Sequence, residues 1–172
     1  MILYTEINVS YLPQPNKVEF ILSDELAPVD LTSTAFMVPV TRSGLYIAAN
    51  NHRRGVEIPG GHIERGETPC SAAHREAVEE AGAWCTHIRA LGYLKMTSQG
   101  QVPADWKYPH PLGYQQFFAG EVLWFSPYQV NDECDFPGLY TIQDAQQKLK
   151  PNMLAIYEAA RQKLFPGRQM IG

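Results

Sequence analysis

The chain has 172 residues, of which 45% are hydrophobic and 19% are charged, so it has room for one folded domain with one buried core. Its formal net charge of -4 disfavours a surface that binds the backbone of a nucleic-acid polymer. The three cysteines, Cys70, Cys85 and Cys134, lack Cys-x-x-Cys spacing, which argues against a disulfide framework and a thiolate zinc site. No stretch is apolar for long enough to span a bilayer, so we expect a cytoplasmic protein without a membrane partner.

Runs of β-branched and aromatic residues bounded by turn residues predict the strands. Residues 1–30 form an N-terminal extension with strands, of which 18–22 is the clearest. The core, residues 31–165, continues with strands at 34–40, 45–49, 87–96 and 114–125, and Ser43-Gly44 fits the hairpin turn between the first two. A shorter strand-like segment, 56–59, ends at Gly60-Gly61.

Three segments carry helix signals. The helix predicted at 69–81 has Thr68 as its N-cap, Pro at its first position and Gly82 at its end. The segments 141–149 and 151–165 are the other two helices, and the first begins with a Thr-x-x-Asp capping pattern. Strands and helices alternate along the chain, so we predict a single α/β domain over residues 1–172, in which helices cover a mixed sheet.

Residues 98–113 hold no periodic pattern and contain three prolines. A connection of this length inside a small domain is commonly a functional loop. Trp106, Tyr108 and His110 lie in it and would stack on a nucleobase, or alternatively anchor the loop to the core.

The helix at 69–81 carries an unusual set of acids. Glu76, Glu79 and Glu80 fall on one helical face, where like charges three and four residues apart repel. Negative charge is also disfavoured near the carbonyl end of a helix. A divalent ion would neutralise such a set, and oxygen ligands favour Mg²⁺. The alternative is that the three glutamates are simply a solvated surface.

The pattern Gly61-x5-Glu67-x7-Arg75-Glu76-Ala77-x-Glu79-Glu80-x-Gly82-Ala83 resembles the signature box of the Nudix hydrolases, which cleave nucleoside diphosphates linked to another group. Every fixed residue of the box is present, although the family usually has bulkier aliphatic residues where Ala77 and Ala83 stand. The resemblance implies an α/β/α sandwich, a mixed sheet and an enzyme that acts on acid anhydrides. Mg²⁺ or Mn²⁺ is the implied cofactor, and His62 and His74 are expected to be structural.

The resemblance also implies roles for individual residues. Glu76, Glu79 and Glu80 would be the catalytic metal ligands, joined by a backbone carbonyl at Gly60 or Gly61. Glu67 and Arg75 would pair and hold the loop on the helix. An acid from a late loop completes the site in many relatives, and the candidates for it here are Asp132, Glu133 and Asp135, although turn residues look the same.

Substrate contacts are less defined by the sequence. Arg53 and Arg54 would contact a terminal phosphate, and Trp106 and Tyr108 would hold the base. By elimination we favour a nucleoside triphosphate or an oxidised nucleotide, followed by other nucleoside diphosphate-X compounds. A non-catalytic nucleotide sensor and an isoprenoid diphosphate isomerase on the same fold are the alternatives. We expect the binding partner to be a small nucleotide substrate. The sequence is compatible with either a monomer or a homodimer.

Overall fold

The computed structural model describes residues 1–127 and 130–168, so residues 128–129 and 169–172 of the predicted domain lie outside the description. In the described part, nine strands form one sheet in the order β1-β2-β7-β8-β3-β4-β5, with β6 paired to β3 and β9 paired to β4. The pair β3 and β8 is parallel, whereas the other pairs are antiparallel. The sheet is therefore mixed, as the sequence predicts.

The strands are β1 (Ile2–Ile7), β2 (Asn16–Leu22), β3 (Thr32–Val40), β4 (Tyr46–Asn51), β5 (Gly55–Glu57), β6 (Gly60–His62), β7 (Ala83–Ser98), β8 (Leu112–Phe125) and β9 (Cys134–Tyr140). The helices are α1 (Pro69–Ala81), α2 (Ile142–Lys148) and α3 (Pro151–Leu164), together with a short 3-10 turn, Val29–Leu31.

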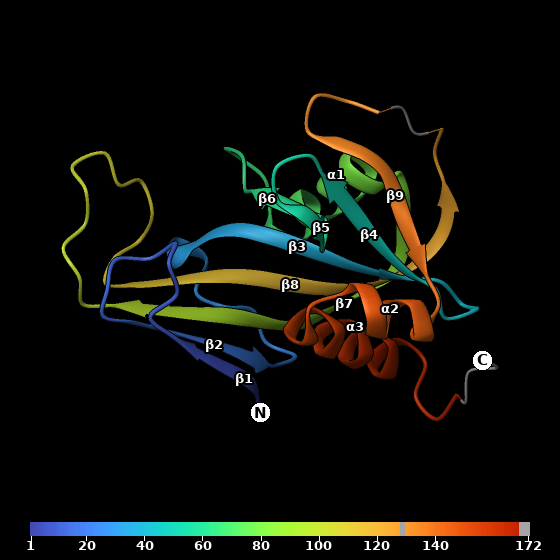
Figure 1. The fold of residues 1–172 in the computed structure, drawn as a ribbon, viewed down its shortest axis with the longest axis horizontal. Coiled ribbons are helices and arrows are strands. Elements are labelled where there is room, and N and C mark those ends of the chain that lie inside the picture. Colours follow the sequence, from blue (N-terminus) through green and yellow to red (C-terminus); the bar gives the residue numbers. More distant parts are fainter. Residues whose placement is uncertain (128–129, 169–172) are drawn as a thin grey trace.

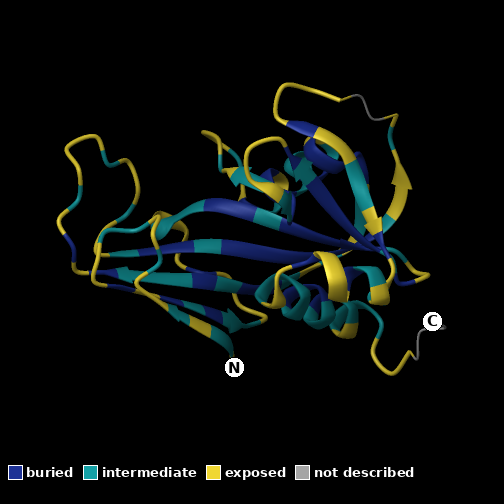
Figure 2. Cartoon of the chain, viewed as in Figure 1, coloured by how far each residue is buried: buried dark blue, intermediate teal, exposed yellow. Residues whose placement is uncertain are grey.

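Helices cover both faces of the sheet (Figure 1), with α1 on one side and α2 and α3 on the other. Alternation along β3 decides this arrangement, because successive side chains of a strand point to opposite faces. Ala35 and Met37 pack with buried alanines of α1, whereas Val38 and Val40 pack with Ile156 and its neighbours on α3. The central strands are accordingly the most buried part of the chain (Figure 2). The predicted α/β/α sandwich is confirmed.

Local hydrogen bonds fix the ends of α1 where the sequence placed them. Thr68 Oγ1 accepts a hydrogen bond from the Ser71 backbone N–H at 3.1 Å, and Ser71 Oγ accepts one from the Thr68 N–H at 2.9 Å. This is a reciprocal capping box. At the other end, Gly82 has a φ of +60°, a left-handed conformation that glycine adopts readily.

Several element bounds differ from the sequence prediction, and two differences bear on the site. The strand predicted at 87–96 begins at Ala83 and ends at Ser98, because β8 pairs with it over nearly its full length, and the loop shortens to residues 99–111. The acids at 132, 133 and 135 were candidates for a late loop, yet Cys134 and Asp135 begin the unpredicted strand β9. Its Pro-Gly pair weakens strand propensity, and pairing with β4 overrides that weakness.

Among the described residues, no helix combines the length and the apolar character that crossing a membrane requires. The three cysteines all lie in the described part of the chain, and none forms a disulfide.

Candidate functional site

The three glutamates of α1 occupy different environments. The Glu79 side chain is 57% exposed, whereas Glu80 is only 7% exposed and Glu76 is half-buried. The expectation of a single acidic face opposite a packed face is therefore wrong for Glu80. The physical reason is that this edge of α1 lies against β6 and β9, which cover Glu80 and leave Glu79 outside.

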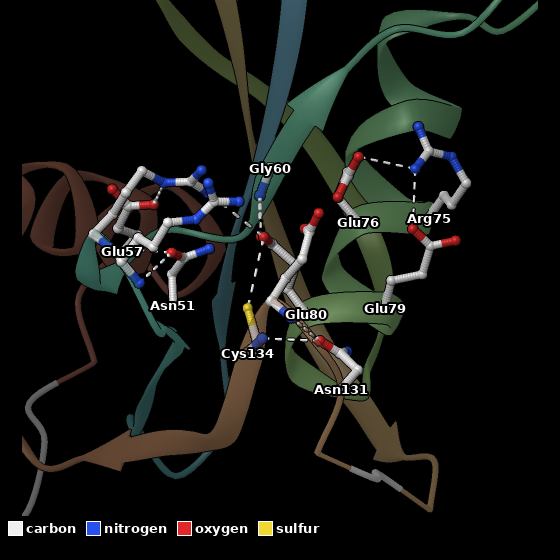
Figure 3. Close-up of polar contacts among 12 residues, drawn as sticks. Asn51, Glu57, Gly60, Arg75, Glu76, Glu79, Glu80, Asn131 and Cys134 are labelled. Atoms are coloured by element: carbon white, nitrogen blue, oxygen red, sulfur yellow. Dashed lines mark hydrogen bonds and ion pairs between the residues drawn. The ribbon is translucent and has the colours of Figure 1, made fainter.

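Glu80 is held by groups from both neighbouring strands (Figure 3). Its Oε2 accepts a hydrogen bond from the Gly60 backbone N–H at 2.9 Å, and the Cys134 thiol lies 3.8 Å from Oε1. Arg54 approaches the same Oε1 at 3.9 Å. Burial is the main cause that raises the pKa of Glu80, and the Gly60 N–H opposes it in part. A buried carboxylate with so little compensation favours the approach of a cation.

Arg75 links the acids of α1 to the loop that precedes it. Its Nε and Nη2 contact the two oxygens of Glu67 at 2.9 and 3.1 Å, which is a bidentate pair. Its Nη1 contacts Glu76 at 2.8 Å and Glu79 at 3.0 Å. Hydrogen bonds from Arg75 are the main cause that lowers the pKa of Glu67 from 4.5 to about 2.

The loop itself is fixed by further backbone contacts. The backbone N–H of Glu64 donates to Glu67 Oε2 at 3.0 Å, and Arg75 Nη2 donates to the His62 carbonyl oxygen at 3.1 Å. The segment between β6 and α1 is therefore tied down by the Glu67 carboxylate and the Arg75 guanidinium.

Two glycines leave room for neighbouring side chains. A Cβ on Gly61 would lie 2.3 Å from Oε1 of Glu76, and a Cβ on Gly60 would lie 2.2 Å from the ring of Phe36. Both distances are far below van der Waals contact. The glycines thus allow β6 to pass close to α1 and to the aromatic side chains of the sheet.

Gly61→Ala should therefore lower hydrolysis by roughly tenfold or more while the protein still folds. The added methyl group meets the flexible end of Glu76, so the carboxylate is displaced and the backbone is not. Steady-state kinetics and a thermal melt of the same sample test this. Gly66→Ala is the control, because a methyl group on Gly66 would meet no neighbouring atom. Its φ of +89° is unfavourable for alanine, so this variant reports the effect of backbone strain alone. Equal activity of the Gly61→Ala variant and the parent would contradict the prediction.

A cavity of about 980 Å³ adjoins the acids. It reaches from the carboxylates across the part of the sheet that carries Phe36 and Phe117 to the N-terminal end of α3, the loop 99–111 and the β1–β2 hairpin. Its charged and histidine lining residues are Arg54, Glu57, His62, Glu64, Glu76, Glu80, His110, Glu133 and Lys150. Its aromatic lining residues are Tyr4, Tyr11, Phe36, Trp106, Tyr108 and Phe117.

The structure separates the other sequence candidates. Arg54 lines the cavity and pairs with Glu57 at 2.6 Å, whereas Arg53 is exposed and does not line it. Glu133 lines the cavity, while Asp135 lies on the exposed side of β9, 3.4 Å from His52. Asp132 is exposed and is also absent from the lining. One of the two candidate arginines, Arg54, and one of the three candidate late acids, Glu133, therefore line the cavity beside the carboxylates.

The loop aromatics face the same cavity, together with a residue that the sequence interpretation treated as structural. The ring of Tyr108 stacks on the ring of His62, with centroids 5.8 Å apart, and the two side chains share a hydrogen bond of 3.2 Å. His62 follows Gly61 directly, a position that could have drawn attention to it. His74, by contrast, accepts a hydrogen bond from the Cys85 backbone N–H at 3.2 Å and has a structural role.

The donor set suits a hard divalent cation. As the side chains stand in the described residues, no group of three or more His, Cys, Asp or Glu residues is arranged to hold a metal ion. Arg75 contacts an oxygen of Glu76, and the Gly60 N–H contacts an oxygen of Glu80. The half-buried Glu76 and the buried Glu80 nevertheless supply oxygen ligands, and burial is the main cause that raises the pKa of both carboxyl groups. Gly61 leaves open the space beside Glu76. These features fit Mg²⁺ or Mn²⁺.

Comparison with known proteins agrees with this geometry. The family model for the NUDIX domain matches residues 31–159, which include the whole box and both strands that contact Glu80. The chain belongs to the Nudix family. Hydrolases of this family act on pyrophosphate bonds, which are acid anhydrides, so the enzyme class predicted from the box is confirmed.

Solved structures share the Nudix fold. The Bacillus subtilis pyrophosphohydrolase BsRppH is 19% identical, with a TM-score of 0.60 over 80% of this chain and 77% of that chain. A Nudix hydrolase from Nitrosomonas europaea is 20% identical, with a TM-score of 0.58 over 77% and 90%. The Nudix domain of Shewanella oneidensis NrtR, solved with ADP ribose, is 14% identical, with a TM-score of 0.59 over 77% and 88%. At these identities the likeness establishes the fold alone.

Proposed function

We propose that this Nudix protein hydrolyses a pyrophosphate linkage in a nucleoside diphosphate-X substrate and that Glu76, Glu79 and Glu80 hold the required Mg²⁺ or Mn²⁺. The observation that carries the proposal is the buried carboxylate of Glu80 and the half-buried carboxylate of Glu76, at one end of the cavity beside Gly60 and Gly61. Burying these charges is costly unless a cation compensates them. When bound, the metal neutralises phosphate oxygens and acidifies water.

The other residues then divide the work of binding and orientation. Arg54 lines the cavity 3.9 Å from Glu80, so its guanidinium would contact a phosphate of the bound substrate. Glu133 supplies a further carboxylate in the same lining and is the late acid that we propose for the site. Glu67 and Arg75 act as positioning residues, because they fix the loop and the first turns of α1.

Within this class we propose a nucleoside triphosphate or an oxidised nucleotide as the preferred substrate. The sparse positive charge of the lining, in which Arg54 and Lys150 are the arginine and lysine residues, supports a small nucleotide over an anionic polymer. Phosphates in such a site need the metal for neutralisation. A long anionic polymer would bind weakly, because few basic residues would contact its backbone.

A metal-supplemented screen tests the proposal. Purified protein is incubated with nucleoside triphosphates, oxidised guanine nucleotides, ADP-ribose and nucleoside diphosphate sugars in the presence of Mg²⁺ or Mn²⁺. Release of mononucleotide, phosphate and pyrophosphate is then measured. We expect turnover of at least one nucleotide with either metal and none in excess chelator. Nucleotide binding without turnover of any compound would identify a sensor and contradict the proposal.

A further inference from the structure

The end of the cavity that lies away from the carboxylates is built partly by residues outside the family match. Tyr4, Tyr11 and Leu12 line the cavity, yet they precede residue 31, where the match begins. They belong to the hairpin of β1 and β2, whose connecting turn, residues 8–15, lies at the same end of the sheet as the loop 99–111 (Figure 1). The N-terminal hairpin is therefore a wall of the cavity.

The turn 8–15 is held in one conformation by Asn16, which is 5% exposed. The Asn16 side-chain oxygen accepts a hydrogen bond from the Val9 N–H at 2.9 Å. Its side-chain nitrogen donates to the carbonyl oxygens of Val9 and Leu12 at 3.0 and 2.9 Å. Tyr11 lies within this fixed turn and is 58% exposed, so its ring is accessible to a ligand.

The turn and the loop are joined to each other. The Gln99 N–H donates to the Pro15 carbonyl oxygen at 3.0 Å, and Ser98 Oγ donates to the Pro13 carbonyl oxygen at 2.6 Å. Gly100 sits so close to the turn that a Cβ there would lie 2.4 Å from the Gln14 carbonyl oxygen. The loop aromatics and Tyr11 thus belong to one connected unit, which we call the hairpin–loop unit (residues 8–15 and 99–111).

The hairpin–loop unit also contacts the signature box. Tyr108 stacks on His62, and the Trp106 ring meets Tyr108 edge to face at a centroid distance of 5.3 Å. The aromatic surface therefore continues from the residue after Gly61 to Trp106. A ligand whose phosphates lie at the carboxylates would reach this surface with its base.

Two buried polar atoms in the cavity lining have no hydrogen-bond partner in the described structure: Nε1 of Trp106 and Oγ1 of Thr34. Thr34 is 8% exposed and lies opposite His62 in the register of β3 and β6. An indole N–H can only donate, and an unsatisfied buried donor is costly. The indole N–H therefore favours a ligand with a hydrogen-bond acceptor on its edge, whereas the Thr34 hydroxyl can donate or accept.

We propose that the hairpin–loop unit is the base-binding part of the cavity, where a nucleobase stacks on Tyr11 and accepts, at its edge, an in-plane hydrogen bond from Trp106 Nε1. Stacking accepts any planar base, whereas the indole donor requires an acceptor on the base edge. The nucleotide as ligand rests on the proposed function, but base binding does not require hydrolysis.

Calorimetric titration of the protein in Mg²⁺ with AMP, GMP, UMP and ribose 5-phosphate, none of which contains a pyrophosphate bond, tests this inference. Trp106→Phe keeps an aromatic ring and removes the N–H, so nucleotide affinity should fall about fivefold to tenfold. Tyr11→Ala should weaken nucleotide binding by at least about fivefold. Ribose 5-phosphate, which has no base, should bind both variants and the parent equally.

Matched controls separate base contact from general damage. Trp124→Phe alters an exposed tryptophan that stacks on Trp84 outside the cavity, and Ile7→Ala alters an exposed residue of β1. Both should bind nucleotides like the parent, and melting curves should show that all four variants are folded. Parental nucleotide affinity in both test variants would overturn the inference, even if the protein is an active hydrolase. Loss of affinity in a protein without turnover would support it and refute the proposed function.

Discussion

Glu80→Gln is expected to abolish most hydrolysis, by at least about a hundredfold, because a ligand that positions the metal contributes several kcal/mol to the barrier. The amide oxygen can still accept the Gly60 N–H that Glu80 Oε2 accepts, so the local hydrogen bond survives. Burial raises the pKa of Glu80, which means that its charged form is costly in the folded protein. The metal-free variant should therefore melt no lower than the parent.

Kinetics across a Mg²⁺ titration and melting curves in chelator measure these two effects. Glu79→Gln should also remove most activity, although the exposure of Glu79 predicts little change in stability. Glu158→Gln on α3 lies outside the cavity lining and serves as the control for a general loss of charge. Parental turnover by both the Glu79→Gln and Glu80→Gln variants would rule out these glutamates as metal ligands.

Arg75→Ala is expected to have the largest effect on stability. Arg75 contacts Glu67, Glu76 and Glu79 and also the His62 carbonyl oxygen, so its removal leaves several carboxylates close together without a counter-charge. We expect the melting temperature in chelator to fall by roughly 5 °C. Added Mg²⁺ should restore part of this loss, since the ion neutralises Glu76 and Glu79.

Arg75→Lys separates charge from geometry. Lysine keeps the positive charge but cannot form the bidentate pair with Glu67, so its stability should lie between those of the parent and Arg75→Ala. A melting temperature for Arg75→Ala equal to that of the parent in chelator would show that the loop does not depend on this contact.

The pair between Glu67 and Arg75 also predicts how stability depends on pH. The pKa of Glu67 is lowered from 4.5 to about 2, so the folded state favours the charged carboxylate more than the unfolded state does. Its contribution is present above pH 4.5 and is lost as the pH falls toward 2. The difference in melting temperature between the parent and Glu67→Gln should shrink over that range and should be constant near neutrality.

The sequence alone determined the features that depend on nearby residues. Both ends of α1 follow from Thr68, Pro69 and Gly82, because capping involves hydrogen bonds within one turn of the helix. The box that identifies the family is likewise a matter of spacing along the chain. The mixed sheet covered by helices on both faces followed from the alternation of strands and helices.

The tertiary structure decided which members of those local patterns are buried and what lies next to them. Helical periodicity put Glu79 and Glu80 on one face, and only the packing of α1 against β6 and β9 buries Glu80 and exposes Glu79. The strand β9 depends on its pairing with β4 rather than on its own Pro-Gly sequence. The contact between the N-terminal turn and the loop 99–111 joins residues more than eighty positions apart, as in the hydrogen bond from Ser98 to Pro13. The burial of a side chain and the register of a strand pair arise from the packing of whole elements. Patterns among residues that are close in sequence therefore cannot specify them.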